Sequence, residues 1–443
     1  MTRLPPGRVI FIGFAVSCLL VLVFYSAASL QHGWYSQHIP GDEPFAAGSC
    51  PAEAYAAGHW SYQPRFPAGN VSLTQFENTF LFNEFEGCAS SREYWWHLGA
   101  DSPDHWDRYP DVTDYKWIPG EGCRGLREFD SVALVRHLVE EGGWLLLGDS
   151  ISENHFFSLS CLLYPHVRAT PYYAPDTGYD HGWPQNLYLS PTSPLVLTLN
   201  FPPGFSIEHT PLVTHRRVDL LLTQPELETL HAATHPELYP PLAETARPLF
   251  SEVAVWTMSP KEYLPLFAAP LPDAHYATII VSTAGHWTTR LFSGLDGDRG
   301  GIGTVLAFFR VAVRYWATQV EEMLTTHLTA HAHAHGDRQV RRPRVIVRAY
   351  LPGHVDCHSH RKPWNDYVWP AESEWNWASI GEFNRIFQEV VSEPEFPDID
   401  FLAIDRPGLL RPDAACEHGL PALDGRRGRH RGLDALHLAF PHA

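Results

Sequence analysis

Residues 148–150, Gly-Asp-Ser, are the first place in this sequence where chemistry is expected. They follow an apolar run at 144–147 that is typical of a buried strand, and residues 151–163 have a helical pattern. A serine at a turn from strand to helix holds its hydroxyl clear of the sheet, and the first N–H groups of the helix can stabilise an oxyanion. Ser150 is therefore the candidate nucleophile.

The end of the chain supplies the other groups that a serine nucleophile requires. Such a serine needs a base, and the base needs a carboxylate that orients it. Asp434 and His437 form a short Asp-x-x-His turn that offers both. Gly-Asp-Ser alone is common in loops, so it is the combination with the terminal Asp-x-x-His that indicates a Ser-His-Asp triad.

Alternating helix and strand patterns are expected to position these residues. A helix is predicted at 131–141, and a long amphipathic helix at 304–326. Strands are predicted at 195–199, 277–282, 345–350 and 401–404, most of them continuous apolar runs typical of strands buried on both faces. The pattern predicts an α/β fold with a parallel sheet and helices on both faces, whose active site lies at the carboxyl ends of the strands. Ser150 and segments 283–287 and 351–354 fall at such ends.

An uncharged, mostly apolar run at 9–30 follows Arg3 and Arg8. A helix of this length can cross the hydrocarbon core of a bilayer, and basic residues ahead of it place the N-terminus in the cytoplasm. We therefore expect an uncleaved single-pass membrane anchor with the rest of the chain lumenal or extracellular. A signal peptide cleaved after 26–28 is the alternative.

The composition is that of a folded protein of the secretory pathway. The chain has 443 residues, of which 44% are hydrophobic, and this excludes a disordered chain. Its net charge of −18 argues against nucleic acid as a partner. Asn70 lies in an N-glycosylation sequon. The histidine-rich tract at 327–335 could bind a metal, but the solvated end of a helix is the favoured interpretation.

Cysteine usage predicts disulfide bonds. Cys18 lies in the expected anchor, and an even number of cysteines remains outside it, which in an oxidising compartment indicates three bridges. The sequence alone leaves 15 pairings open. The absence of a Cys-x-x-Cys pair argues against a structural zinc site. The remaining cysteines are Cys50, Cys88, Cys123, Cys161, Cys357 and Cys416.

The chain is expected to have four parts. Residues 1–30 form a cytoplasmic tail with the anchor, and 31–49 form a stem that contains glycine and proline. Residues 50–125, rich in cysteine and aromatic residues, form a small irregular subdomain held by disulfides. Residues 126–443 form the catalytic domain.

Short motifs along the chain resemble those of the trichome-birefringence-like family, which has a PC-esterase domain of the GDSL/SGNH type. The Gly-Asp-Ser block, 148–154 with 158–163, is the most similar piece. The others, in chain order, are Cys50 with 58–60, then 86–88 and 115–117 with Cys123, then 285–287, 314–317, 348–354 and 433–437. The resemblance extends over roughly residues 50–440, and each piece alone is weak, but pieces in the family's order are hard to explain by chance.

The resemblance implies a three-layer SGNH-hydrolase-like fold and an O-acetyltransferase of the Golgi or endoplasmic reticulum membrane. Its acceptor would be a polysaccharide or glycan. His437 would deprotonate Ser150, Asp434 would orient His437, and an acetyl group would pass through Ser150 to a sugar hydroxyl. The co-substrate would be an acetyl donor, acetyl-CoA or an acetylated intermediate, with no bound cofactor and no metal. The residues expected to support the oxyanion are Gly148, Asp149, Thr283, Gly285 and His286.

Family likeness also implies a Cys50–Cys123 bridge and next Cys357–Cys416, which leaves Cys88 with Cys161. Two departures from the family pattern matter. Thr283 stands where the family usually has Asn, and Ala435 where it has Cys. We therefore do not expect this chain to have the family's complete oxyanion site or its complete set of disulfides.

Two other functions are compatible with the sequence. A glycan acyl esterase would use the same triad and let water resolve the acyl-enzyme. A non-catalytic glycan-binding protein would need none of Ser150, Asp434 and His437, so their joint presence favours an enzyme. The expected lumenal anchor favours transfer over hydrolysis.

Overall fold

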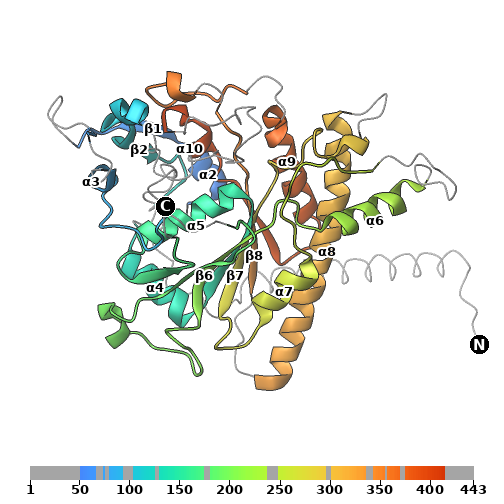
Figure 1. Ribbon diagram of the computed structural model, residues 1–443, viewed down its shortest axis with the longest axis horizontal. Helices are drawn as coiled ribbons and strands as arrows, with labels where there is room; N and C mark the ends of the chain where they lie inside the picture. Colours follow the sequence, from blue (N-terminus) through green and yellow to red (C-terminus); the bar gives the residue numbers. More distant parts are fainter. Residues whose placement is uncertain are drawn as a thin grey trace, which may run out of the picture. The chain divides into compact units, whose positions relative to one another are not determined.

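Among the residues that the structure describes, seven strands form one mostly parallel sheet in the order β4-β5-β6-β3-β7-β8-β9 (Figure 1). The computed structural model describes residues 50–65, 73–74, 79–92, 103–124, 129–173, 180–236, 248–295, 301–335, 343–354, 357–369 and 375–414. The strands are β1 (His59–Tyr62), β2 (Tyr115–Ile118), β3 (Gly143–Gly148), β4 (Val167–Thr170), β5 (Gln185–Leu189), β6 (Pro211–Arg217), β7 (Tyr276–Ser282), β8 (Arg344–Arg348) and β9 (Ile399–Leu402). The α-helices are α2 (Ala52–Ala56), α3 (Thr79–Asn83), α4 (Ser131–Glu140), α5 (Ser150–Leu162), α6 (Gln224–Thr234), α7 (Pro260–Ala268), α8 (Ile302–His335), α9 (Ile380–Val391) and α10 (Arg406–Leu409).

Strand β3 lies at the point where the chain changes direction across the sheet. It pairs in parallel with β6 on one side and with β7 on the other. After β3 the chain passes through α5, β4 and β5 to β6 on one side of β3, and it then passes through α6 and α7 to β7 on the other side. In open α/β sheets ligands bind at the carboxyl ends of the strands beside such a switch. The residues that follow β3 therefore stand where this fold places a binding site.

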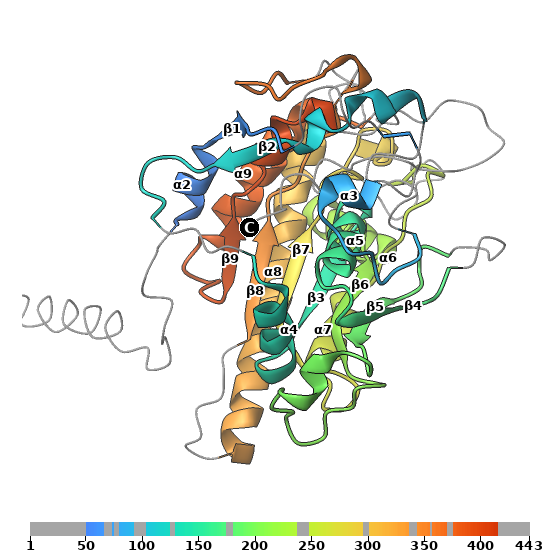
Figure 2. The ribbon, with the colours of Figure 1, turned by 90° about the vertical axis from the view of Figure 1, so that its left-hand side faces the viewer.

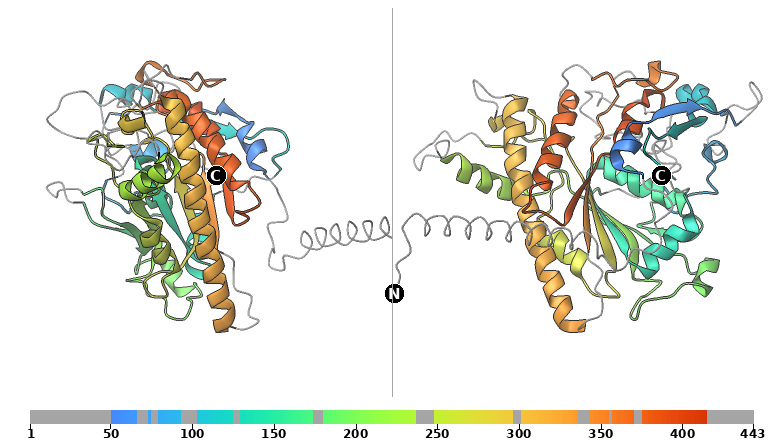
Figure 3. Two further views of the ribbon diagram at one scale, coloured as in Figure 1. Left: turned by 90° about the vertical axis from the view of Figure 1, so that its right-hand side faces the viewer. Right: turned by 180° about the vertical axis from the view of Figure 1, so that it is seen from behind.

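Helices cover both faces of the sheet, as the apolar runs predict. Leu145 and Leu147 of β3 face a core shared with α8 and α9. Leu146 faces the opposite core, shared with α4 and α5. Figure 2 shows this layering, and Figure 3 shows α8 and α9 side by side on their face of the sheet. A strand buried on both faces needs no polar side, which explains why β3 could be recognised as a continuous apolar run.

Two details of the sequence-based prediction are wrong. Residues 195–199 are not a strand, because a 3₁₀ helix, η5 (Pro194–Leu197), occupies most of the segment. Ser193 accepts a hydrogen bond from the N–H of Leu195, and Pro194 has the fixed φ that suits a first helical position. The sheet is also not parallel throughout, since β5, the second strand from one edge, runs antiparallel to both of its neighbours, β4 and β6.

Residues 50–123 contain a two-stranded antiparallel sheet, β1 with β2, and pack against the last part of the described chain. The indole Nε1 of Trp60 donates to the carbonyl of Pro407 at 2.9 Å. The buried guanidinium of Arg411 lies 4.5 Å from the Trp60 ring centroid and donates to both carboxylate oxygens of Asp413. Segments far apart in the sequence are thus joined by buried polar contacts.

Within the described ranges two disulfides are present, Cys50–Cys123 and Cys88–Cys161, which agree with the first pair that the family likeness implied and with the pair that it left over. Each joins residues 73 positions apart. Cys357 is buried, and its expected partner Cys416 lies outside the described residues.

Several other expectations also fall outside the described residues. They concern the anchor at 9–30, Asn70, Asp434 and His437. No helix in the described ranges is both long enough and apolar enough to cross a membrane.

The equal spacing of the two disulfides gives a matched test of their role in stability. Replacing either pair of cysteines by alanine is expected to lower the free energy of unfolding by about 2–4 kcal/mol, because each bridge restricts a long loop of the unfolded chain. The two losses should agree within about 1 kcal/mol, since loop-closure entropy depends only on loop length. Chemical denaturation of the full chain measures both. A clearly larger loss at Cys88–Cys161 would show that contacts around α5, and not loop length, set its contribution.

Candidate functional site

Ser150 is the first residue of α5, directly after the turn that ends β3. Its side chain is partly exposed, whereas the preceding residues of β3 and the turn are almost all buried. The strand therefore delivers a hydroxyl from the interior of the sheet to its carboxyl edge. This is the position that the sequence predicts for a nucleophile.

Gly148 makes this turn possible, because no side chain fits at its position. A Cβ there would lie 2.1 Å from the carbonyl oxygen of Ser282 in β7 and 2.3 Å from Oγ of Ser152 in α5. The φ of Gly148 is +156°, which side chains rarely adopt. The glycine thus lets β3, β7 and the first turn of α5 approach one another closely. Its role is steric.

Asp149 is fully buried and caps α5. Its Oδ1 accepts a hydrogen bond from the N–H of Ile151 at 3.1 Å, and its backbone carbonyl accepts from the N–H groups of Ser152 and Glu153. Burial raises the pKa of this carboxyl group. Three N–H groups at the start of the helix are thus bonded to Asp149. They are not available to an oxyanion, which corrects the simple expectation of open N–H groups at this helix end.

One hydrogen bond joins three of the sequence motifs. The hydroxyl of Tyr350, from the segment after β8, donates to Oδ2 of Asp149 at 2.8 Å. A Cβ on Gly285 would lie 2.2 Å from that same hydroxyl. The glycine of Gly-His-Trp is therefore needed so that Tyr350 can pass and reach Asp149. Packing therefore explains why residue 285 is a glycine. The sequence analysis had predicted a role for it in supporting an oxyanion.

A histidine and a carboxylate lie together beside this turn. Nε2 of His286 is 3.7 Å from Oδ1 of Asp219, and the His286 side chain is 12% exposed. Asp219 is fully buried and accepts hydrogen bonds from Nε of Arg217 at 3.0 Å and from the N–H of Trp256 at 2.8 Å. A partly accessible imidazole therefore lies next to a carboxylate whose position is fixed by hydrogen bonds.

Thr283 does not replace the family's Asn as a free donor. Its hydroxyl donates to the backbone carbonyl of Asp219, and the side chain is fully buried. The hydroxyl therefore fixes the end of β7 against the segment after β6. This finding agrees with the doubt that the Asn-to-Thr departure raised about an oxyanion role.

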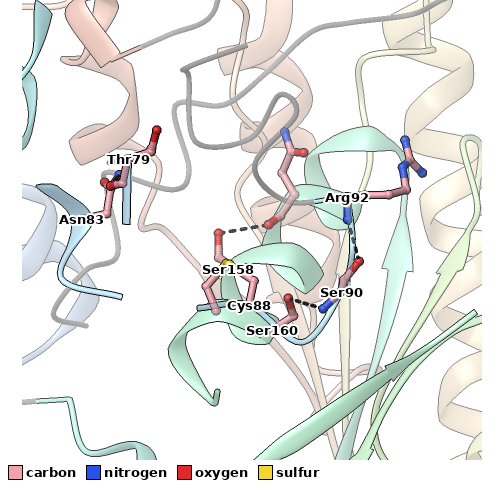
Figure 4. The surroundings of a disulfide bond; sticks show 9 residues. Thr79, Asn83, Cys88, Ser90, Arg92, Ser158 and Ser160 are labelled. Atoms are coloured by element: carbon pink, nitrogen blue, oxygen red, sulfur yellow. Dashed lines mark hydrogen bonds between the residues drawn. A yellow bond between two sulfur atoms is a disulfide. The ribbon is translucent and has the colours of Figure 1, made fainter. Parts of the chain in front are cut away.

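The disulfide Cys88–Cys161 holds a segment of chain along α5 (Figure 4). Next to it, the N–H of Ser90 donates to Oγ of Ser160 at 3.3 Å. Arg92 follows and donates to Oε1 of Glu153 at 3.4 Å. Glu153 is in the first turn of α5, and it also accepts from Nε2 of Gln185 in β5 at 2.7 Å. The bridge thus fixes a positive charge near the start of the helix that carries Ser150.

Buried histidines near α5 are neutral at physiological pH. Burial lowers the pKa of His215, in β6, to about 4, and Nε2 of its ring lies 3.3 Å from the carbonyl oxygen of Gly148. Burial, together with the charge of Arg348, lowers the pKa of His155 to about 3. His215 is buried, whereas His155 is partly exposed, and the low pKa of each means that neither imidazole takes up a proton readily. They contribute to packing and to the hydrogen bonds of the turn.

The structure brings Gly148, Asp149 and Ser150 together with segment 283–286, as the positions at strand ends predict. Asp434 and His437 lie outside the described residues, so their position relative to Ser150 stays a prediction. In the described part of the chain, no group of three or more His, Cys, Asp or Glu side chains is arranged to hold a metal ion.

Sequence reasoning missed how buried charged and polar groups surround the turn. They are Arg217, Asp219, Arg348 and the hydroxyl of Tyr350. A signal was present for two of them, since Arg217 ends β6 and Asp219 follows it, and the carboxyl end of a parallel strand is where this kind of fold places a site. No local pattern indicates the contact between Tyr350 and Asp149, which are 201 residues apart.

Gly148→Ala is expected to lower the free energy of unfolding by about 2–4 kcal/mol, because overpacking and backbone strain each cost about 1–3 kcal/mol. The matched control is Gly303→Ala in α8, where a Cβ meets no atom within 4 Å. That change is expected to be neutral or to stabilise by up to about 1 kcal/mol. Chemical denaturation compares the two variants. Equal stabilities would contradict the close approach of β7 at Gly148.

Tyr350→Phe tests the hydrogen bond to Asp149. Removing the hydroxyl is expected to destabilise by about 1.5–3 kcal/mol, the usual range for a bond to a charged group. It is also expected to raise the pKa of Asp149 further, since this bond favours the carboxylate. Labelling of Ser150 by a fluorophosphonate should slow.

The control for that variant is Tyr263→Phe. Tyr263 is equally buried, and its hydroxyl donates to the backbone carbonyl of Leu221 at 2.9 Å. Its loss should lower stability by about 0.5–1.5 kcal/mol without changing the rate at which Ser150 is labelled. A labelling rate that falls equally in both variants would show a general loss of stability.

Comparison with known proteins adds no family to these observations. No protein-family model matches the chain, and no curated protein matches its sequence. The chemistry of the site must therefore be inferred from its own residues.

Proposed function

We propose that the protein is an SGNH-like serine O-acetyltransferase that transfers an acetyl group to a hydroxyl of a polysaccharide or glycan. The Ser150 hydroxyl attacks the carbonyl carbon of the acetyl donor while His437 takes its proton and Asp434 orients His437. The donor's leaving group departs with that proton, and Ser150 carries the acetyl ester. A sugar hydroxyl then attacks the ester carbonyl and gives its proton to His437, which passes it to Oγ of Ser150 as the bond between that oxygen and the acetyl group breaks, so that the free serine and neutral His437 are regenerated.

The observation that carries the proposal is the placement of Ser150. A partly exposed serine follows the central strand at the topological switch of the sheet and begins a helix. Gly148 removes the steric obstacle, and Asp149 fixes the helix start through hydrogen bonds to three N–H groups. A serine without a chemical role needs neither device, since a hydroxyl at a helix start is normally satisfied by simple capping.

The N–H of Ser150 itself is part of the proposed oxyanion site. The three N–H groups that follow it are bonded to Asp149, so the first helical N–H is the one that remains to meet a developing negative charge. The donor is positioned so that its carbonyl oxygen lies at this N–H.

The proposal also includes the expected location of the protein in a lumenal membrane compartment. It includes the expected role of residues 50–125 as a subdomain.

A second candidate for the base is His286, and a specific observation favours it. Its imidazole is partly accessible, and its Nε2 is 3.7 Å from the buried carboxylate of Asp219. Both groups act electrostatically on Asp149, next to Ser150. We prefer His437 with Asp434, because Asp219 is already paired with Arg217 at 3.0 Å.

The experiment that tests the function is transfer from a labelled acetyl donor, acetyl-CoA in the first instance, to a panel of glycans by the full chain. Acetylated glycan supports a transferase. Release of labelled acetate at an equal rate with and without glycan would support the esterase. Glycan binding without acetyl-Ser150 would support a binding protein.

Ser150→Ala is expected to abolish both acetyl transfer and fluorophosphonate labelling, a loss of about 10⁴-fold or more, with unchanged stability. Ser158→Ala is the matched control. Ser158 is in the same helix, and its hydroxyl donates to the backbone carbonyl of Asn154 (Figure 4). It should retain activity. Labelling that persists in Ser150→Ala would exclude Ser150 as the nucleophile.

The same assay separates the two possible bases. If His437 is the base, His437→Ala should lose about as much as Ser150→Ala, and the double variant should lose little more, because the residues act as one unit. His286→Ala should then keep most of the transfer rate. The reverse pattern would assign the base to His286.

A further inference from the structure

The carbonyl group of Gly148, just before the turn that carries Ser150, lies against a buried histidine. Nε2 of His215 is 3.3 Å from this carbonyl oxygen, and the N–H of Val218 donates to the same oxygen at 3.0 Å. His215 belongs to β6 and is 1% exposed. A carbonyl oxygen only accepts, so the neutral imidazole bonds to it only if its proton is on Nε2. The surroundings of the ring must therefore select this tautomer.

The other ring nitrogen of His215 faces Gln185, its direct partner in the neighbouring strand. The two residues are opposite each other in the antiparallel pairing of β5 with β6, and Nε2 of Gln185 lies 3.4 Å from Nδ1 of His215. The same amide nitrogen donates to Oε1 of Glu153 at 2.7 Å. An amide NH₂ group has two protons, so it can donate to both neighbours at once. Gln185 thus joins the histidine to the first turn of α5.

The charge of Glu153 fixes the direction of these bonds. Glu153 is 1% exposed and forms an ion pair with Arg92, whose Nη1 lies 3.4 Å from Oε1. A carboxylate accepts and does not donate, so Gln185 must turn its amide nitrogen, and not its oxygen, toward Glu153. That nitrogen also meets Nδ1 of His215, which must then accept. The proton of the imidazole is left on Nε2, where it faces Gly148.

The outer end of this chain of contacts is held by the disulfide Cys88–Cys161. The N–H of Arg92 donates to Oγ of Ser90 at 3.4 Å. The N–H of Ser90 donates in turn to Oγ of Ser160, which is next to the bridge in α5, at 3.3 Å. The cation that pairs with Glu153 is therefore held against the helix that carries this carboxylate.

We propose that Glu153, Gln185 and His215 form a positioning network for the turn. The carboxylate of Glu153 sets the tautomer of His215, and His215 holds the carbonyl of Gly148. The backbone N–H of Glu153 also donates, at 3.0 Å, to the carbonyl of the residue after Gly148. The contacts therefore form a closed ring that holds both ends of the turn to β5 and β6. The consequence for catalysis rests on the proposed role of Ser150.

Nitrogen NMR of the full chain, labelled with ring-¹⁵N histidine, tests the tautomer directly. The variant His215→Phe identifies the signals of His215 by their loss. In the wild type the proton should be on Nε2. In Glu153→Gln the new amide can either accept from Gln185 or donate to it, so the direction is no longer fixed and the tautomer with its proton on Nδ1 should appear. A wild-type proton on Nδ1, or an unchanged tautomer in Glu153→Gln, would overturn the proposal.

A double-mutant cycle tests whether Glu153 acts through His215. Glu153→Gln and His215→Phe should each slow the labelling of Ser150 by a fluorophosphonate about 3- to 10-fold, the usual effect of one hydrogen bond. The double variant should be slower than either single variant by less than about twofold, because the first change already breaks the path on which the second acts. Losses that multiply in the double variant would contradict the network.

Two controls separate the network from a general loss of stability. His231→Phe also replaces a buried histidine, since His231 in α6 is 3% exposed and its ring centroid lies 5.0 Å from that of Phe308. It should leave the labelling rate within about twofold of wild type. Glu226→Gln, also in α6, is the control for the carboxylate. Combined with His215→Phe, it should give effects on the unfolding equilibrium constant that multiply.

A conservative variant separates the hydrogen bond from packing at His215. His215→Gln can place an amide N–H close to the position of Nε2, whereas His215→Phe fills a similar volume without a donor. Labelling of Ser150 should therefore be faster in His215→Gln than in His215→Phe. Equal rates would show that only the volume of the ring matters, and the proposed bond to Gly148 would have no role.

Failure of this network and failure of the proposed function give different results. If Ser150 of the wild type is not labelled at all, the proposed function fails. The tautomer of His215, and the same cycle of Glu153→Gln with His215→Phe measured by chemical denaturation, still decide whether the network exists. If Ser150 is labelled but the effects multiply in both cycles, the network fails and the function stands.

Discussion

The buried carboxylate of Asp149 is the constraint on which the other features of the site depend. It is held by the N–H of Ile151 on one oxygen and by the hydroxyl of Tyr350 on the other. Both bonds favour the ionised carboxylate and lower its pKa, whereas burial in this interior raises it. The close approach that it demands explains two glycines. Gly148 lets the helix start reach β7, and Gly285 leaves room for Tyr350. Sequence motifs that are far apart along the chain therefore pack together around this carboxylate.

The polar interior is concentrated at one end of the sheet. Along β3, the side chains of Leu145, Leu146 and Leu147 are all buried in apolar cores. At the carboxyl end, charged groups replace them within a few residues, as Asp149, Asp219, Arg217 and Arg348 show. Buried charges rarely stabilise a fold as well as apolar packing does. Their presence at this edge, and the apolar cores elsewhere, indicate that the edge has been shaped by a requirement other than stability.

The sequence predicts those parts of the fold in which the local pattern and the tertiary environment agree. Strand β3 and helix α5 were recognisable because a strand buried on both faces is a continuous apolar run and Asp149 is a strong helix cap. Segment 195–199 has the same apolar character, but Ser193 and Pro194 favour a helical turn there. That local preference determines the structure of the segment, which is mostly a 3₁₀ helix. Strands β4 and β5 were not predicted individually because strands of four and five residues have a weak signal. At the site, the turn at Ser150 was predictable, whereas the contacts of Tyr350 and the pairing of Arg217 with Asp219 depend on strands that only the folded sheet brings together.

Two buried guanidinium groups lie at this edge, and they differ in how they are compensated. Arg217 and Asp219 are in direct contact, and the cation is also packed against the ring of Trp256 at 4.5 Å, so this pair is fixed by contact. Arg348 is 4% exposed, and none of its guanidinium nitrogens has a hydrogen-bond partner among the described residues. A buried cation without such partners is costly. The fold therefore keeps, at the edge that carries Ser150, a charge that apolar packing would replace at lower cost.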